Sequence, residues 1–242
     1  MTYFSNFPLE DRPRKTVGLI GFDGFSTADL TGPLDAFAGA RDVNGDACYE
    51  TILIGVVNPM FVSASGAMFK GEHTLTTAPL LDTIIIPGGP NLPGSETSKL
   101  LARWLRERGA SARRIAAVST GIYPLADSGL LDGRRVTTHW RFAQHLASTF
   151  RTLQVSDAGG FIRDGKFYTC GGGTAGVEMS LGLIEEDYGA RTALRLAREL
   201  VVSLRPAGGD ERYLSPVYQQ CSSEERLADL PAWITRRLRD DL

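Results

Sequence analysis

The chain has little cysteine, little histidine and almost no net charge. Its 242 residues include 3 cysteines and 3 histidines, and 26 basic residues nearly balance 28 acidic ones, for a net charge of −2. The odd number and wide spacing of Cys48, Cys170 and Cys221 favour neither a disulfide framework nor a zinc ribbon. The near-neutral charge disfavours an extended nucleic-acid-binding surface. We therefore expect a protein of a reducing cytoplasm that does not itself contact DNA.

Long hydrophobic runs are also missing. No segment approaches the roughly 20 apolar residues of a membrane helix, and the polar N-terminal stretch has no apolar core of a signal peptide. This predicts a protein that is neither exported nor embedded in a membrane. With 43% hydrophobic and 22% charged residues, the composition is that of an ordinary globular chain, which favours one large domain with an appendage.

Apolar runs typical of buried strands alternate with segments of helical periodicity. The expected strands cover residues 16–22, 49–57, 81–89 and 114–118, with a hairpin within 59–70. Two intervening segments carry apolar residues at helical spacing: Leu30, Leu34, Phe37 and Ala38, then Leu100, Leu101, Trp104 and Leu105. This alternation predicts an α/β fold, a doubly wound, mostly parallel sheet with helices on both faces.

The second half continues with a hairpin, two helices and a loop. Residues 159–173 predict a hairpin that turns at Asp164 and Gly165, and residues 204–217 predict a surface loop. Helical spacing recurs at Val177, Leu181 and Ile184; at Ala190, Leu194, Ala197 and Val201; and at Leu227, Leu230, Ile234 and Leu238. We expect a loose extension over 1–15, a domain over 16–203, and over 204–242 a loop and amphipathic helix that begin a linker.

The stretch AVSTG, residues 117–121, places Ser119 where a buried strand turns into a helix. It is one residue away from the G-x-S-x-G pattern of serine hydrolases. Two of the three histidines follow within 26 residues of Ser119, which leaves little room for an acid-bearing strand in the Ser, Asp, His order. A serine without an adjacent base is a poor nucleophile, so a small polar residue tolerated at a tight turn explains the pattern equally well.

Three other features have two readings each. Asp29 either projects into the crevice beside Ser119 or stabilises a helix N-terminus through the helix dipole. The PGG sequence at 87–89 either turns backbone N–H groups toward a ligand or forms a tight strand exit. His139 is either a base or, more commonly, a packed and hydrogen-bonded ring. The glycine-rich CGGGTAG, residues 170–176, lacks nucleotide-binding spacing.

Four segments together resemble the signature segments of the ThiJ/PfpI superfamily. They are GFDGFSTADLTGPLDAF, IIIPGG, VSTGIYPLADSGLLDGRRVTTHW and CGGGTAGVEMSLGLI, and they span about residues 16 to 202 in the expected order. LLDGRRVTTHW, ARELVV and the terminal ERLADLPAWITRRLRDDL resemble the N-terminal sensor domain of AraC-type transcription regulators. Isonitrile hydratases, which share the first half of the pattern, are the nearest enzymes.

The resemblance implies roles for particular residues. Ser119 stands where the superfamily keeps its reactive cysteine, and Asp29 where an acidic residue hydrogen-bonds that thiol. Gly89 and Thr120 stand where backbone amides form an oxyanion pocket, Thr120 also where PfpI-type proteases carry a histidine, and His139 lies near that pocket. A protease or amidotransferase triad is therefore incomplete. The ligand-binding residues this predicts are Asp29, Gly88, Gly89, Ser119, Thr120 and His139.

These expectations define one leading hypothesis and one alternative. The leading hypothesis is the small-molecule-sensing domain of an AraC-type regulator, without catalytic activity, cofactor or metal. It binds a small polar molecule, forms a homodimer, and contacts DNA only through a C-terminal module absent from this chain. The alternative is an isonitrile-hydratase-like enzyme in which Ser119, Asp29 and His139 are the candidate catalytic residues. The choice between them rests on the resemblance, because a fold alone does not determine a function.

Overall fold

A seven-stranded sheet forms the centre of the molecule. The structure is a computed structural model that describes residues 14–156 and 160–202. The strand order is β10-β11-β7-β6-β1-β2-β5, and all neighbours run parallel except β10 and β11. The strands are β1 (Lys15–Gly21), β2 (Tyr49–Gly55), β5 (His73–Thr74), β6 (Thr83–Ile86), β7 (Arg114–Val118), β10 (Phe161–Asp164) and β11 (Phe167–Cys170). The predicted doubly wound, mostly parallel sheet is confirmed.

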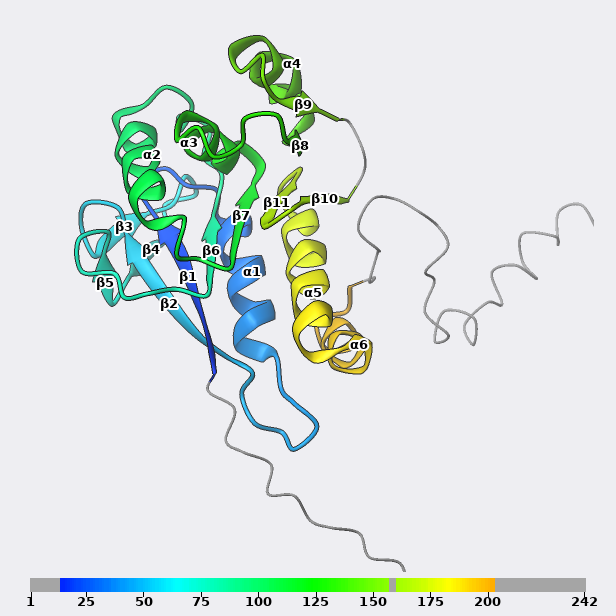
Figure 1. Ribbon diagram of the computed structural model, residues 1–242. Helices are drawn as coiled ribbons and strands as arrows, with labels where there is room; N and C mark the ends of the chain where they lie inside the picture. The colour runs from blue at the N-terminus through cyan, green and yellow to red at the C-terminus, as the bar shows by residue number, and fades with distance from the viewer. Residues whose placement is uncertain (1–13, 157–159, 203–242) are drawn as a thin grey trace, which may run out of the picture.

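Helices cover both faces of this sheet (Figure 1). One face carries α1 (Thr27–Gly39), α5 (Thr174–Tyr188) and α6 (Ala190–Glu199), and the other carries α2 (Glu96–Arg108) and α3 (Ile122–Asp127). Because both faces are covered, every residue of β6 and β7 is buried, and all of them except Thr83 and Arg114 at the strand starts are apolar. The three consecutive isoleucines that predicted a buried strand, Ile84, Ile85 and Ile86, are at most 1% exposed.

Two small two-stranded sheets lie outside the central one. The predicted hairpin within 59–70 is β3 (Met60–Val62) paired with β4 (Met68–Lys70). A second pair, β8 (Arg135–Val136) and β9 (Gln154–Val155), brackets α4 (Trp140–Thr149), and in Figure 1 this unit projects from one end of the sheet. The hairpin predicted within 159–173 is also confirmed, as β10 and β11.

The predicted helix faces are wrong at four residues. Ala38 of α1 and Ala190 of α6 are exposed, Leu100 of α2 is 40% exposed, and Val201, which follows α6, is 90% exposed. The face that α6 buries consists of Thr192, Ala193, Leu196 and Ala197. Apolar spacing fixes a helical period but not which edge of the stripe lies deepest, because an adjacent threonine or alanine is buried equally well.

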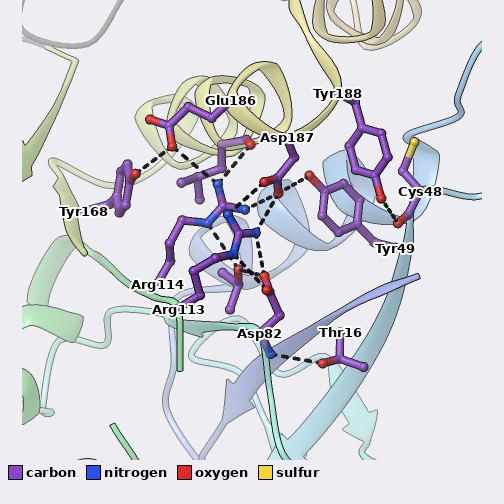
Figure 2. A network of polar contacts seen from close by, with 12 residues as sticks. Thr16, Cys48, Tyr49, Asp82, Arg113, Arg114, Tyr168, Glu186, Asp187 and Tyr188 are labelled. Carbon is purple, nitrogen blue, oxygen red and sulfur yellow. Dashed lines mark hydrogen bonds and ion pairs between the residues drawn. The ribbon is translucent and has the colours of Figure 1, made fainter. Parts of the chain in front are cut away.

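The amino end of the sheet is closed by a network of ion pairs (Figure 2). Arg114 at the start of β7 contacts Asp187 near the end of α5, and the side chains of both are at most 4% exposed. Arg113 adds contacts to Asp187 at 2.9 Å and to Asp82 at 2.7 Å, and the Tyr49 hydroxyl donates to Asp187 at 2.8 Å. These contacts hold the C-terminal end of α5 against the starts of β7 and β2 and the residue before β6.

Several sequence predictions lie outside the described residues. They concern Cys221, the loop over 204–217 and the terminal helix that carries Leu227, Leu230, Ile234 and Leu238. Cys48 and Cys170 are both buried and free. Within residues 14–156 and 160–202, no helix has the length and apolarity needed to cross a membrane.

Candidate functional site

Four adjacent parallel strands end at one edge of the sheet and bring the predicted residues together. In the order β11-β7-β6-β1, these ends carry the 171–173 glycines, Ser119, the 87–89 turn and the loop that leads to Asp29. The chain runs outward from β1 in one direction and from β6 in the other, so β1 and β6 flank the point where strand order reverses. Open α/β sheets usually bind ligands at such a point.

The strand-to-helix elbow at Ser119 is confirmed. β7 ends at Val118, a 3₁₀ turn covers Ser119–Gly121, and α3 begins at Ile122. Ser119 has φ 55°, a left-handed conformation that is strained for any residue other than glycine. The Thr138 hydroxyl donates to the Ser119 carbonyl at 2.8 Å and helps to hold this turn. Ser119, which is 8% exposed, therefore lies at the edge of the sheet where the parallel strands end.

Thr120 joins the elbow to the neighbouring turn after β6. Its hydroxyl accepts a hydrogen bond from the Gly89 N–H and donates one to the Gly89 carbonyl, both at 2.8 Å. The resemblance implied that the Gly89 amide faces an oxyanion, but this N–H is already used inside the protein. Thr120 is 2% exposed, and its hydroxyl together with the Gly89 N–H forms a wall of the site.

Asp29 lies in the first turn of α1, the helix that follows β1, and is 4% exposed. Its Oδ1 accepts the Gly173 N–H at 2.7 Å, and the Gly88 backbone supplies a second hydrogen bond. Burial raises the pKa of this carboxyl, against the opposing effects of those two backbone bonds and of His139. The sequence offered two alternatives for Asp29, a place beside Ser119 and a place in the first turn of a helix. The structure shows both, because Asp29 is in the first turn of α1 and both Asp29 and Ser119 border Gly172.

His139 is the N-cap of α4 and forms no ion pair with Asp29 among the described residues. Its Nδ1 accepts the Arg141 N–H at 3.3 Å, and its ring stacks on the 73% exposed Trp140 at a centroid distance of 5.6 Å. No hydrogen bond between His139 and Ser119 is present among the described residues. His139 is thus at the site but is not placed as the base of Ser119.

Sequence reasoning missed the role of the glycines after β11. Gly172 has φ 100°, and a Cβ there would lie 2.8 Å from the Ser119 Cβ and 3.2 Å from its Oγ. The segment CGGGTAG was judged only as a nucleotide loop, whereas here it packs against Ser119 and donates to Asp29. The signal that could have found it is topological, because glycines after a parallel strand next to β7 must border the same crevice.

Cys170, the last residue of β11, pairs in register with Val118 and lies next to the elbow. It is fully buried, and burial raises the pKa of its thiol to about 12. A thiol with this pKa is almost wholly protonated at neutral pH and is a weak nucleophile. Cys170 therefore does not replace the cysteine missing at Ser119.

The site combines the Ser119 hydroxyl, the Asp29 carboxylate and the His139 imidazole with the backbone of Gly88 and Gly172, which packs closely against Ser119 and Asp29. No cluster of three or more metal-ligating side chains occurs among residues 14–156 and 160–202. The arrangement can orient a small polar ligand through a few hydrogen bonds. It offers Ser119 no hydrogen-bonded base through which the hydroxyl would become a nucleophile.

The fold and this strained elbow define an α/β protein of the DJ-1/PfpI type. Residues 15–186 match the model of the DJ-1/PfpI family, and the chain belongs to that family. It is 32% identical over 190 residues to the isonitrile hydratase of Pseudomonas putida, which covers 78% of this chain and 79% of the hydratase. It is 25% identical over 200 residues to the HTH-type transcriptional regulator GbdR of Pseudomonas aeruginosa.

The match to GbdR covers 83% of this chain but 54% of the regulator, so the chain spans about half the length of that relative. Among solved structures, an AraC family transcriptional regulator from Pseudomonas putida aligns with a TM-score of 0.69 and 20% identity. That alignment covers 77% of this chain and 99% of the regulator chain, and at this identity it shows the shared fold alone.

Proposed function

We propose that this chain is the small-molecule-sensing domain of an AraC-type transcription regulator and that it carries out no catalytic turnover. Similarity to regulators such as GbdR supports the regulator class. In this proposal the ligand contacts Asp29, Ser119 and His139, while Gly88, Gly89 and Thr120 form the walls. DNA contact comes from a separate helix-turn-helix module of the full-length protein.

The single observation that carries the proposal is the isolation of the Ser119 hydroxyl. The elbow geometry of a nucleophile is kept, with φ 55°, but among the described residues no histidine or carboxylate hydrogen-bonds the side chain. A hydroxyl is several pKa units less acidic than a thiol, so surroundings that suffice for a thiolate do not generate an alkoxide. The turn therefore presents a hydrogen-bonding group to a ligand without activating it.

The alternative is an isonitrile-hydratase-like enzyme, which the 32% identity to the Pseudomonas putida hydratase favours. In that case Asp29 would activate water, and Ser119 would replace the thiol. Purified chain incubated with an alkyl isonitrile distinguishes the two functions. The sensor proposal predicts no N-alkylformamide above the buffer control, whereas formamide production lost in the Asp29→Asn variant would establish the enzyme.

Ligand binding is tested at Ser119 directly. Each neutral hydrogen bond contributes about 0.5 to 1.5 kcal/mol, so Ser119→Ala weakens ligand binding by roughly a factor of 2 to 13 and leaves the fold intact. Ser148→Ala is the matched control, because Ser148 is exposed on α4. Unchanged affinity of Ser119→Ala, measured by calorimetry with the ligand found in the fragment screen below, would remove Ser119 from the site.

The proposed regulator acts in the cytoplasm as a homodimer, because AraC-type regulators read paired half-sites. The proposed class supports the dimer, because a two-fold symmetric regulator binds the two half-sites of its DNA target. Sedimentation equilibrium tests it, and a two-fold mass at micromolar concentration is expected. A monomer throughout the high micromolar range would contradict the dimer and leave the ligand site untouched.

A further inference from the structure

Two buried carboxylates of this molecule differ in what neutralises them. Asp187 contacts the guanidinium groups of Arg113 and Arg114 and accepts the Tyr49 hydroxyl. Asp29 has only the backbone N–H groups of Gly173 and Gly88 and the neighbouring His139 ring. Among the described residues no arginine or lysine forms an ion pair with Asp29, although it is 4% exposed.

A buried carboxylate without a cationic partner is unfavourable, because transfer from water removes hydration that backbone dipoles replace only in part. The cost is visible in the direction of its pKa, which burial raises. A protein that used Asp29 only as a helix N-terminal residue would gain from leaving it exposed. Its position at the ligand edge of the sheet means that a bound molecule, rather than a side chain, can supply the missing positive charge.

His139 forms no ion pair with Asp29 among the described residues, although its electrostatic effect opposes the rise in the pKa of that carboxyl. Its Nδ1 instead accepts a hydrogen bond from the Arg141 N–H at 3.3 Å, as the N-cap of α4. The His139 ring follows Thr138, whose hydroxyl donates to the Ser119 carbonyl, and it stacks on Trp140, which is 73% exposed, with an interplanar angle of 27°. An aromatic surface next to a carboxylate is a suitable environment for an organic cation.

Backbone stands close to both carboxylate oxygens and limits the size of the charged group. A Cβ at Gly88 would lie 2.7 Å from Asp29 Oδ2, and a Cβ at Gly172 would lie 3.2 Å from Oδ1. Each oxygen keeps a lone pair for a directional donor, but the walls leave no room for bulky substituents around the charge. This geometry favours a compact cation that bears N–H groups over a fully alkylated one.

We propose that the ligand of this site is a small molecule with a primary ammonium group, for which Asp29 is the counter-ion, Ser119 a hydrogen-bonding neighbour and the His139–Trp140 pair an aromatic border. The inference rests on the proposed ligand-binding function and goes beyond it by fixing the charge and donor type of the ligand. The apolar remainder of the ligand then lies toward Trp140.

A fragment series of constant size tests the charge. n-Butylammonium, the neutral 1-pentanol and the anionic pentanoate are titrated into ¹⁵N-labelled protein, and the amide signals of Ser119 and Gly173 are followed. The expected result is that n-butylammonium binds at least tenfold more tightly than the other two. Butyltrimethylammonium, which has the charge but no N–H, is expected to bind at least fivefold more weakly than n-butylammonium.

Asp29→Asn removes the charge and keeps an oxygen to accept the Gly173 N–H. This variant is expected to lose the tenfold preference for n-butylammonium over 1-pentanol, while Asp35→Asn, which neutralises an exposed carboxylate of the same helix, keeps it. If Asp29→Asn does not fold, the ranking of the four fragments on the unaltered protein decides alone.

The outcomes separate this inference from the proposed function. Tighter binding of 1-pentanol or pentanoate at Ser119 and Gly173 would overturn the cation and leave a ligand-binding site in place. Equal binding of the trimethylated fragment would overturn the requirement for N–H groups. Absence of binding by all four at tens of millimolar would overturn the inference outright, whereas formamide production from an isonitrile would overturn the proposed function instead.

Discussion

The two ends of the central sheet treat buried charge in opposite ways. At the amino end, Asp187 is held by Arg113, Arg114 and Tyr49, and the tyrosine and guanidinium contacts join α5 to the neighbouring strands (Figure 2). At the carboxyl end, Asp29 is buried beside the strained Ser119 and has no cationic side chain among the residues described. One end is internally neutralised, and the other is left with a charge and a strained turn.

Under the proposed function, this difference separates the part of the fold that serves stability from the part that serves ligand binding. Burying an acid without a cation and holding a serine at φ 55° both oppose folding, at about 1 to 3 kcal/mol for the strained residue alone. Such features persist only where the surrounding structure imposes them, and they cluster at functional sites. α5 links the two ends, since its N-cap Gly173 donates to Asp29 and its last turn carries Asp187.

The largest expected effect comes from breaking the amino-end network. Arg114→Leu removes a guanidinium whose side chain is 3% exposed and leaves Asp187 with Arg113 and the Tyr49 hydroxyl. We expect the free energy of unfolding to fall by about 3 kcal/mol, as measured by urea denaturation. Lys99→Ala, which breaks an exposed ion pair with Glu96, is the control and is expected to leave the free energy of unfolding nearly unchanged. Equal effects of the two substitutions would contradict the distinction between the ends.

Thr138→Val tests how the elbow is held at the carboxyl end. The substitution keeps the shape of the side chain but leaves the buried Ser119 carbonyl without the donor that lies 2.8 Å from it. We expect a loss of about 1 to 3 kcal/mol in the free energy of unfolding. Thr149→Val removes a hydroxyl that donates at 2.8 Å to the His145 carbonyl on the exposed side of α4, and less than half that loss is expected. A smaller loss for Thr138→Val than for Thr149→Val would show that the turn does not depend on this bond.

Ser119→Gly sharpens the same point in the opposite direction. Glycine adopts φ 55° without steric conflict, so the substitution is expected to stabilise the protein by up to about 1 kcal/mol while it weakens ligand binding. Stability is read from urea denaturation and binding from the amide titration. Destabilisation by this substitution would mean that the Ser119 hydroxyl stabilises the turn. Ser119 would then not lower the stability of the protein in exchange for ligand binding.

The smallest effect is a difference in pH dependence between the two ends. Burial raises the pKa of Asp29 in the folded state above 3.8, so the folded protein binds the proton more tightly and loses stability as pH rises from 3.8 to that higher pKa. At Asp82 burial is opposed and outweighed by hydrogen bonds from Arg113 and Thr83, which lower its pKa; its stabilisation is present above 3.8 and is lost as pH falls through the lower value. The sign therefore differs between the two acids.

Urea denaturation of three proteins between pH 3 and 7 checks this sign. Relative to Asp29→Asn, the unaltered protein is expected to lose stability with rising pH, and relative to Asp82→Asn it is expected to gain. The groups that face Asp29 are His139 from the start of α4 and Cys170 from the end of β11, so the comparison is repeated in His139→Gln. The same slope for both acids would show that the two ends do not differ electrostatically.

The sequence predicts the carboxyl end better than the amino end, for a physical reason. Strand runs such as Thr83–Ile86 and the elbow at Ser119 are local patterns, and parallel topology then brings their ends together. The Arg114–Asp187 pair joins residues 73 positions apart, and nothing local distinguishes these charges from exposed ones. The contact of Gly173 with Asp29, 144 residues apart, was missed for the same reason. Helix edges were misjudged at Leu100 and Val201, since periodicity does not rank burial within a stripe.

The most direct test of the central claim, that the elbow presents Ser119 to a ligand without activating it, is intact-protein mass spectrometry after exposure to an acylating or phosphonylating serine reagent at neutral pH. The account predicts an unmodified mass for the protein and for Asp29→Asn, with a serine hydrolase labelled in the same tube as the positive control. Stoichiometric modification mapped to Ser119 and abolished in Asp29→Asn would show an activated nucleophile and contradict the account.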